Sequence, residues 1–308
     1  KLEVIISESK IDYERVLSIL TSNRIEYFVL NRIDNNPKLN LLPINFLNEL
    51  KKNYFKKSLS TLKIVEKVFL LSEKLLMSNI EHIFLKGISL YDSKKMYMRP
   101  MRDIDILVNP EDISKVIDEV KSLNFNFISG EIEISDDYLN NSLFYDLPPM
   151  VDKNGVHLEI HFRIIAESRK CILKDRLLES KKTIKIHDND ICVPCTDSLF
   201  THIVFHGSKK GNFDVGLSVI ADLIQLSEKV DNYRVLRISE SLELRAITES
   251  FFEIIESSKN KKFIMSKNAE KLKEVLIFPS LNSAITEILL QESFLKMLAK
   301  LKDTVFVS

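Results

Sequence analysis

The chain has 308 residues, 45% hydrophobic and 29% charged, which is the composition of a globular protein with a sizeable core. Its 44 basic and 44 acidic residues cancel, so no overall charge attracts nucleic acid or an anionic membrane. No apolar run reaches the roughly 18 to 20 residues of a membrane span, and the first residues do not open a signal peptide. Three cysteines, an odd number, argue against a disulfide scaffold, and we expect a cytoplasmic protein.

Residues 9 to about 80 have the apolar spacing of helices, with a break at Asn35-Asn36-Pro37. The longest predicted helix runs from about Asn45 to Met77. Its expected apolar face comprises Leu62, Val65, Val68, Phe69, Leu75 and Leu76.

The pattern changes to strands in the middle third of the chain. Strands are predicted at 82–85, 103–108, 125–128 and 156–162, with a helix from the Asn109-Pro110 turn to about Leu123. The turn at 152–155 is expected to close a hairpin into the last of these strands. A mixed sheet with helices on one side, in an α+β or α/β arrangement, is the natural packing. A lone Cys-x-x-Cys at Cys192 and Cys195 favours a buried strand end over a metal or redox site.

The last third returns to helical patterns. We expect Asp197 to cap a helix carrying Leu199, and further helices at about 216–229, 233–243, 245–258 and 281–302. The predicted organisation is an N-terminal helical region over 1–80, a core over 81–195 and a C-terminal helical region over 196–308.

The most informative stretch joins a Lys86-Gly87 turn to a strand that carries Asp103 and Asp105. Strand side chains alternate, so both carboxylates point the same way while Ile104 and Ile106 enter a core. Paired carboxylates repel each other unless a cation lies between them, and Mg²⁺ takes oxygen ligands of this kind. Lys86 and the close backbone approach that Gly87 allows suit a phosphate. The alternative is a polar strand edge beside a plain turn.

A third carboxylate stands on the later strand. His157, Glu159, His161 and Arg163 share one face there, opposite an apolar face. Taken by itself, this row favours the water-facing side of a sheet. Beside a two-aspartate strand it becomes a candidate third acidic group for phosphoryl or nucleotidyl transfer.

These two blocks resemble a family of largely uncharacterised bacterial nucleotidyltransferases in the DNA polymerase beta-like superfamily. The resemblance rests on residues 85–90 and 99–108, and on Pro148-Pro149-Met150 with residues 155–163. A less specific third block is His202 and His206 on one helix with Asp222 on the next; hydrogen bonding and packing between helices is the favoured interpretation. The fold implied is α+β, a polymerase-beta-like core with a small mixed sheet and helical flanks.

The resemblance implies that Asp103, Asp105 and Glu159 bind two Mg²⁺ ions, with Mn²⁺ as an alternative, and that Glu159 accepts the proton of the acceptor. Lys86, Gly87, Ser89 and Arg99 are expected at the nucleotide. Ser89 is otherwise a helix cap, and Arg99 otherwise braces an aspartate. His161 and Arg163 are candidates for an acceptor or base contact. Where the superfamily usually has serine directly after the glycine, this chain has Ile88.

The expected reaction moves an NMP, with AMP favoured, from an NTP to a hydroxyl-bearing acceptor and releases pyrophosphate. The acceptor stays open between a small molecule, a protein or peptide side chain and an RNA end. Two alternatives remain: a phosphotransferase using the same site, and a non-catalytic nucleotide-binding regulatory or antitoxin-like module. All three acidic positions are present, which disfavours the second.

Overall fold

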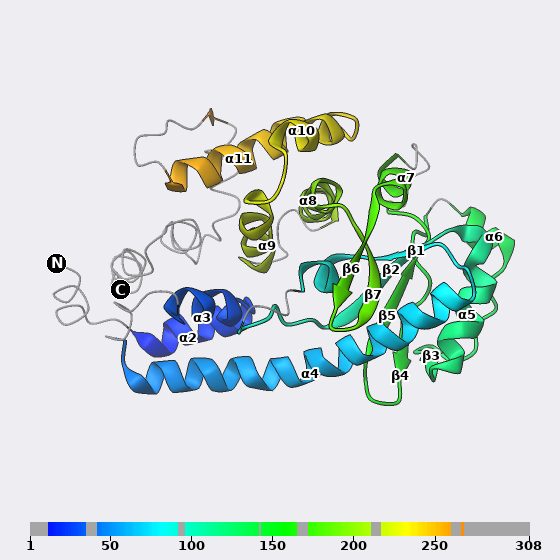
Figure 1. The fold of residues 1–308 in the computed structure, drawn as a ribbon, viewed down its shortest axis with the longest axis horizontal. Coiled ribbons are helices and arrows are strands. Elements are labelled where there is room, and N and C mark those ends of the chain that lie inside the picture. The colour runs from blue at the N-terminus through cyan, green and yellow to red at the C-terminus, as the bar shows by residue number, and fades with distance from the viewer. Residues whose placement is uncertain are drawn as a thin grey trace. The chain divides into compact units, whose positions relative to one another are not determined.

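The computed structural model describes residues 12–34, 42–91, 96–141, 143–164, 172–210, 217–259 and 266–267. The chain divides into two compact units. One comprises residues 1–55 and 200–308, and the other comprises residues 56–199. The boundaries fall inside two helices, α4 (Ile44–Met77) and α8 (Thr196–Phe205) (Figure 1). The predicted division at 80/81 and 195/196 stays a prediction.

The unit formed by the two ends of the chain is helical in its described part. Asp12 caps helix α2 (Tyr13–Ser22) by accepting a hydrogen bond from the Arg15 amide at 2.9 Å. The helices that lie wholly within this unit are α2 (Tyr13–Ser22), α3 (Glu26–Asp34), α9 (Leu217–Ser227), α10 (Asn232–Glu240) and α11 (Arg245–Lys259), with a π-helical turn, η4 (His206–Lys210).

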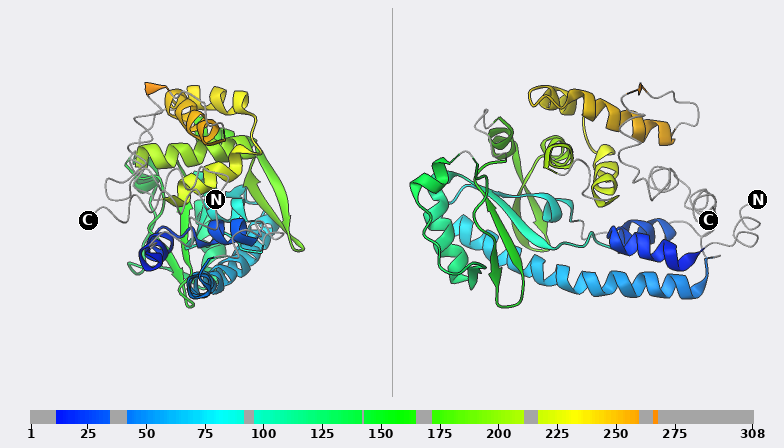
Figure 2. Two further views of the ribbon diagram at one scale, coloured as in Figure 1. Left: turned by 90° about the vertical axis from the view of Figure 1, so that its left-hand side faces the viewer. Right: turned by 180° about the vertical axis from the view of Figure 1, so that it is seen from behind.

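The other unit is built on a five-stranded sheet in the order β1-β2-β5-β4-β3. Only the central β2–β5 pair is parallel, so the sheet is mixed. The strands are β1 (His82–Phe84), β2 (Asp103–Val108), β3 (Phe125–Phe127), β4 (Met150–Asp152) and β5 (His157–His161). The connecting helices are η2 (Lys86–Leu90), η3 (Pro110–Asp112), α5 (Ile113–Ser122), α6 (Asp136–Asn140) and α7 (Ile172–Glu179). A second, two-stranded antiparallel sheet is formed by β6 (Lys181–Ile186) and β7 (Asn189–Pro194) (Figure 2).

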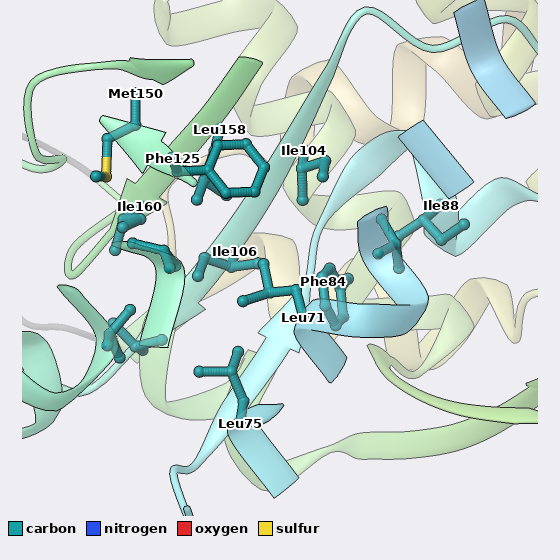
Figure 3. Packing of buried hydrophobic residues seen from close by; sticks show 14 of the residues in the cluster. Leu71, Leu75, Phe84, Ile88, Ile104, Ile106, Phe125, Met150, Leu158 and Ile160 are labelled. Atoms are coloured by element: carbon teal, nitrogen blue, oxygen red, sulfur yellow. The ribbon is translucent and has the colours of Figure 1, made fainter. Parts of the chain in front are cut away.

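One face of the five-stranded sheet is covered by α5 and by the C-terminal half of α4 (Figures 1 and 2). Alternate side chains of the two central strands, Ile104 and Ile106 from β2 and Leu158 and Ile160 from β5, enter this core. Figure 3 shows these side chains together with Leu71 and Leu75 of α4 and with Phe84, Ile88, Phe125 and Met150. The intervening residues of both strands therefore face the other side.

The long helix predicted at about 45–77 is confirmed as α4, but its predicted apolar face is partly wrong. Leu62 is 50% exposed and Leu76 is 48% exposed. Val65, Val68 and Leu75 are buried as expected, together with Leu71. The buried side chains of α4 are those that pack against the sheet. An apolar side chain elsewhere on the surface of the same helix stays exposed to solvent.

The α+β class is confirmed, as are the four strands, the helix after Asn109-Pro110 and the hairpin turn at 152–155. The sequence missed α6, α7 and the β6–β7 hairpin. Cys192 lies in β7 and Cys195 just after it, and both thiols are half-buried and free. Asp197 lies inside the first turn of α8, so its prediction as the cap is wrong. The break at 35–37 and the helix at 281–302 lie outside the described residues.

Candidate active site

The parallel pairing of β2 with β5 brings the acidic positions together. Asp105 is paired with Glu159, and Asp103 is paired with His157. Directly paired strand residues point to the same side of the sheet, here the side opposite the α4–α5 core. Asp105 is buried, whereas Asp103 and Glu159 are half-buried. Two carboxylates that are 54 residues apart in sequence thus become neighbours.

The Lys86 ammonium lies beside the central carboxylate. The antiparallel β1–β2 pairing continues through a hydrogen bond from the Leu85 amide to the Asp105 carbonyl, at 2.9 Å. The next residue, Lys86, has φ +45°, which is rare for a residue with a side chain. Its Nζ donates to Asp105 Oδ1 at 2.8 Å. Backbone strain at this turn accompanies the contact between the lysine and the carboxylate.

His161 is the last residue of β5, and its ring contacts the Asp105 and Glu159 carboxylates. Its Nε2 is 3.1 Å from Asp105 Oδ1 and 3.5 Å from Glu159 Oε2. Its Nδ1 is 3.9 Å from Asp146 Oδ2. The ring is buried, and an isolated antiparallel bridge pairs the backbone of His161 with that of Asp146. His161 therefore contacts the paired carboxylates through Nε2, and Asp146 is near its other ring nitrogen.

The charged side chains of this site shift one another's pKa values. Burial opposes ionisation of Asp105, but Lys86 and His161 outweigh it and hold the pKa of Asp105 well below its usual range. Burial and the neighbouring Asp105 raise the pKa of Asp103, against the opposing effect of Lys86. A hydrogen bond from His161 lowers the pKa of Glu159. At neutral pH the site therefore carries two ionised carboxylates, Asp105 and Glu159, beside the Lys86 ammonium.

The other residues predicted to bind the nucleotide, Gly87, Ser89 and Arg99, interact with neighbouring residues of the protein. A Cβ atom at position 87 would lie 2.9 Å from Met101 Cγ, which is too close for two carbon atoms. The packing of the Met101 side chain therefore favours glycine at this position. Ser89 Oγ donates to the Phe84 carbonyl at 2.7 Å and does not cap a helix. Arg99 contributes to the field at Asp103 by opposing the rise of that carboxyl's pKa. The helix expected after Gly87 is the five-residue 3₁₀-helix η2.

Arg163 is not brought to the carboxylates. Its guanidinium donates to the carbonyls of Leu139 at 2.6 Å, Asn141 at 2.8 Å and Phe144 at 3.0 Å. Its Cζ atom lies 5.2 Å from the centroid of the Phe162 ring. Arg163 follows β5, where the alternation of the strand no longer fixes its direction. These hydrogen bonds tie residues 139, 141 and 144 to the end of β5.

The third sequence block lies in the helical unit. Asp222 is buried and accepts a hydrogen bond from the Tyr27 hydroxyl at 3.2 Å. The His202 and His206 rings lie with their centroids 6.4 Å apart. These contacts agree with the interpretation of hydrogen bonding and packing between helices.

Asp146 is the member of the site that the sequence did not indicate. It lies outside the named strands, and it reaches His161 because Leu147 N donates to the Ile160 carbonyl at 2.8 Å and Phe162 N to the Tyr145 carbonyl at 3.1 Å. No local spacing relates positions 146 and 161. Only the pairing of two distant segments places this carboxylate beside the imidazole.

The donor set suits a divalent cation. One ligand atom each from Asp105, Glu159 and His161 lies within 4.8 Å of the others. Two of these are carboxylate oxygens, the ligands that Mg²⁺ and Mn²⁺ favour. Asp103 lies two residues before Asp105 on the same side of β2. The residues present therefore fit the metal that the sequence resemblance implies.

Comparison with known families decides the identity. Residues 9–257 match the profile of a family described as uncharacterised nucleotidyltransferase. The chain belongs to this family. The resemblance found in the sequence is confirmed, and so is the expected enzyme class, a nucleotidyltransferase.

A solved structure similar to this nucleotidyltransferase is a crystal structure of an antigenic nucleotidyltransferase-like protein from Paracoccidioides brasiliensis. The two chains share 13% sequence identity with a TM-score of 0.37, over 60% of this chain and 90% of that one. No curated protein matches the chain. In the part of the chain that the structure describes, no helix is long and apolar enough to cross a membrane.

Proposed function

We propose that this nucleotidyltransferase is Mg²⁺-dependent and moves an NMP, with AMP preferred, from an NTP to a hydroxyl-bearing acceptor, releasing pyrophosphate. The observation that supports this most directly is the pairing of Asp105 with Glu159 across β2 and β5, with the Lys86 ammonium 2.8 Å from Asp105. A cation-binding carboxylate pair and a fixed ammonium are the two charges that handling a triphosphate requires.

In this proposal Asp103, Asp105 and Glu159 hold the metal, which neutralises phosphate charge and orients the phosphates when it is bound. Lys86 contributes a permanent positive charge beside the same carboxylates and binds a phosphate oxygen. Glu159 is ionised at neutral pH, so its carboxylate has the free oxygen that an acceptor hydroxyl needs as a proton acceptor. Catalysis then comes from positioning and charge neutralisation.

The experiment incubates the protein and Mg²⁺ with each labelled NTP in turn, and follows pyrophosphate release and transfer of label to the protein or to added acceptors. Asp105→Asn keeps the shape of the side chain and removes its charge, so we expect turnover to fall about 10²–10³-fold or more. Asp188→Asn, at an exposed aspartate in the β6–β7 turn, is the matched control and is expected to keep full activity.

Each outcome separates one reading from another. Turnover that survives Asp105→Asn would contradict the proposed role of the cluster. ADP in place of pyrophosphate would identify a phosphotransferase. Nucleotide binding without any product, across a panel of hydroxyl acceptors, would identify a regulatory module.

We also propose that the protein works in the cytoplasm. The free thiols of Cys192 and Cys195 support a reducing compartment. Fractionation of the native host, probed with an antibody against the protein, tests this assignment.

A further inference from the structure

The imidazole of His161 lies between the two carboxylates that pair across β2 and β5. We propose that His161 Nε2 is itself a ligand of the metal, together with Asp105 and Glu159, and that the site therefore prefers a transition-metal dication such as Mn²⁺ over Mg²⁺. This inference rests on the proposed function, because it concerns the cation of that same site.

The distances suit three ligands of one ion. Nε2 lies 3.1 Å from Asp105 Oδ1 and 3.5 Å from Glu159 Oε2. Adjacent ligands of an octahedral ion are about 3 Å apart when each is about 2.1 Å from the metal. All three ligand atoms already lie within 4.8 Å of one another. Small side-chain movements are therefore enough to bring them to a shared ion.

The fold also presents the correct nitrogen. The backbone bridge between His161 and Asp146 fixes where the ring enters the site, and Nδ1 lies on the side of Asp146 Oδ2, 3.9 Å away. Metal-binding histidines commonly direct their second ring nitrogen to a carboxylate, which sets the tautomer and the ring orientation. Asp146 is therefore a positioning residue for the imidazole, and Nε2 is the nitrogen left to face the carboxylates.

The mixed donor set determines which metal is preferred. Oxygen ligands suit both Mg²⁺ and Mn²⁺, but an imidazole nitrogen favours a transition metal over Mg²⁺. His161 is buried, with 5% of its side chain exposed, so it cannot leave the ion's surroundings for solvent without a rearrangement of β5. The nitrogen thus contributes to the affinity for Mn²⁺ and adds little to the affinity for Mg²⁺.

The decisive measurement is pulsed electron paramagnetic resonance of the protein loaded with Mn²⁺, without nucleotide. Direct coordination by imidazole is expected to give an electron spin echo modulation from ¹⁴N in the wild-type protein. We expect His161→Gln to abolish this modulation. His187→Asn, which removes an exposed histidine from the β6–β7 turn, is the matched control and is expected to retain it.

Calorimetric titration measures the preference separately. We expect the wild-type protein to bind Mn²⁺ at least about ten-fold more tightly than Mg²⁺, and His161→Gln to lose most of that ratio through weaker Mn²⁺ binding. Asp146→Asn is expected to keep the nitrogen modulation and to weaken Mn²⁺ binding by about ten-fold. Circular dichroism establishes that each variant is folded, and the wild-type spectrum decides the matter where His161→Gln does not fold.

Wild-type protein that binds Mn²⁺ without nitrogen modulation, or modulation that persists in folded His161→Gln, would overturn the assignment. These failures are distinct from failure of the proposed function. If nitrogen coordination is seen but no NTP is turned over, His161 is a metal ligand and the proposed reaction is wrong. If NTP is turned over with Mg²⁺ but no nitrogen coordination is seen, the proposed reaction stands and His161 is not a ligand.

Discussion

At the scale of single residues, the site is a balance of charges around Asp105. One oxygen of this buried carboxylate contacts both Lys86 and His161, at 2.8 Å and 3.1 Å. A buried carboxylate is costly without such partners, so Lys86 and His161 stabilise the fold as well as the site. Lys86 reaches its position through a left-handed backbone, at a cost of about 1 kcal/mol or more.

His82 provides a test of buried ionisation away from the site. Its ring is buried in β1, and Nδ1 lies 2.9 Å from the Ile80 carbonyl. Burial lowers the pKa of His82 below its usual value, with a further contribution from Lys181. The unfolded chain therefore binds a proton below about pH 6.5 that the folded protein resists, and stability falls as the pH decreases.

We expect His82→Phe to reduce this loss of stability between about pH 7 and pH 5, by up to about 1.4 kcal/mol for each pH unit over which only the unfolded chain is protonated. Urea unfolding of both proteins across that range measures the difference. His161, whose pKa is raised, titrates in both proteins and cancels from the comparison. Identical pH profiles for the variant and the wild type would show that His82 is not the group responsible.

At the scale of elements, the β4–β5 turn depends on Asp152. Its buried carboxylate accepts hydrogen bonds from the amides of Asn154 and Val156, at 2.8 and 2.9 Å, and pairs with Lys67 at 3.0 Å. Burial opposes ionisation, but these contacts outweigh it and lower the pKa of Asp152. The turn is thus held by one charged side chain that also links it to α4.

We expect Asp152→Asn to destabilise the protein by about 2 kcal/mol at neutral pH. The substitution removes the ion pair with Lys67 and replaces the charged acceptor of the two backbone hydrogen bonds with a neutral one. The difference from wild type should shrink as the pH falls below about 4, because the unfolded chain then binds a proton at Asp152 that the folded protein, with its lowered pKa, still resists. Denaturant unfolding at neutral and acidic pH measures it, with Asp188→Asn as the exposed control. An equal effect of both substitutions would contradict this account of the turn.

The two flanks of α4 give a second prediction at this scale. Leu71 is fully buried against the sheet, whereas Leu62 is 50% exposed. We expect Leu71→Ala to lower the free energy of unfolding by about 3 kcal/mol and Leu62→Ala by no more than about 0.5 kcal/mol. The pair has the same chemistry in the same helix, so chemical denaturation reports burial alone. A comparable loss from both would mean that the helix buries its other flank as well.

At the scale of the whole molecule, the core of the sheet lies inside one unit. Every residue of the buried cluster on the α4–α5 side falls between Ile64 and Val193, within residues 56–199. A fragment of residues 42–205, which keeps α4 and α8 intact, is therefore expected to fold by itself and to unfold in one cooperative urea transition. Circular dichroism follows the transition. A fragment without such a transition would show that this unit depends on the rest of the chain.

The sequence determined whatever depends on local spacing. Alternation fixed which residues of β2 and β5 enter the core and which stand with Asp105 and Glu159, because successive strand side chains point to opposite faces. Helical period and turn chemistry likewise located α4 and the 152–155 turn. The same local rules could not separate Leu62 from Leu71, since both are leucines of one amphipathic helix and only the contact with the sheet distinguishes them.

The tertiary structure decided which segments are neighbours. Parallel pairing of β2 with β5 placed Asp105 beside Glu159, the β1–β2 pairing brought in Lys86, and a bridge to β5 brought in Asp146. Arg163 was predicted to share a face with His157, Glu159 and His161. It points elsewhere, because β5 ends before this residue. Backbone hydrogen bonds between distant segments are satisfied only when the sheet assembles, so no spacing within the sequence encodes these encounters.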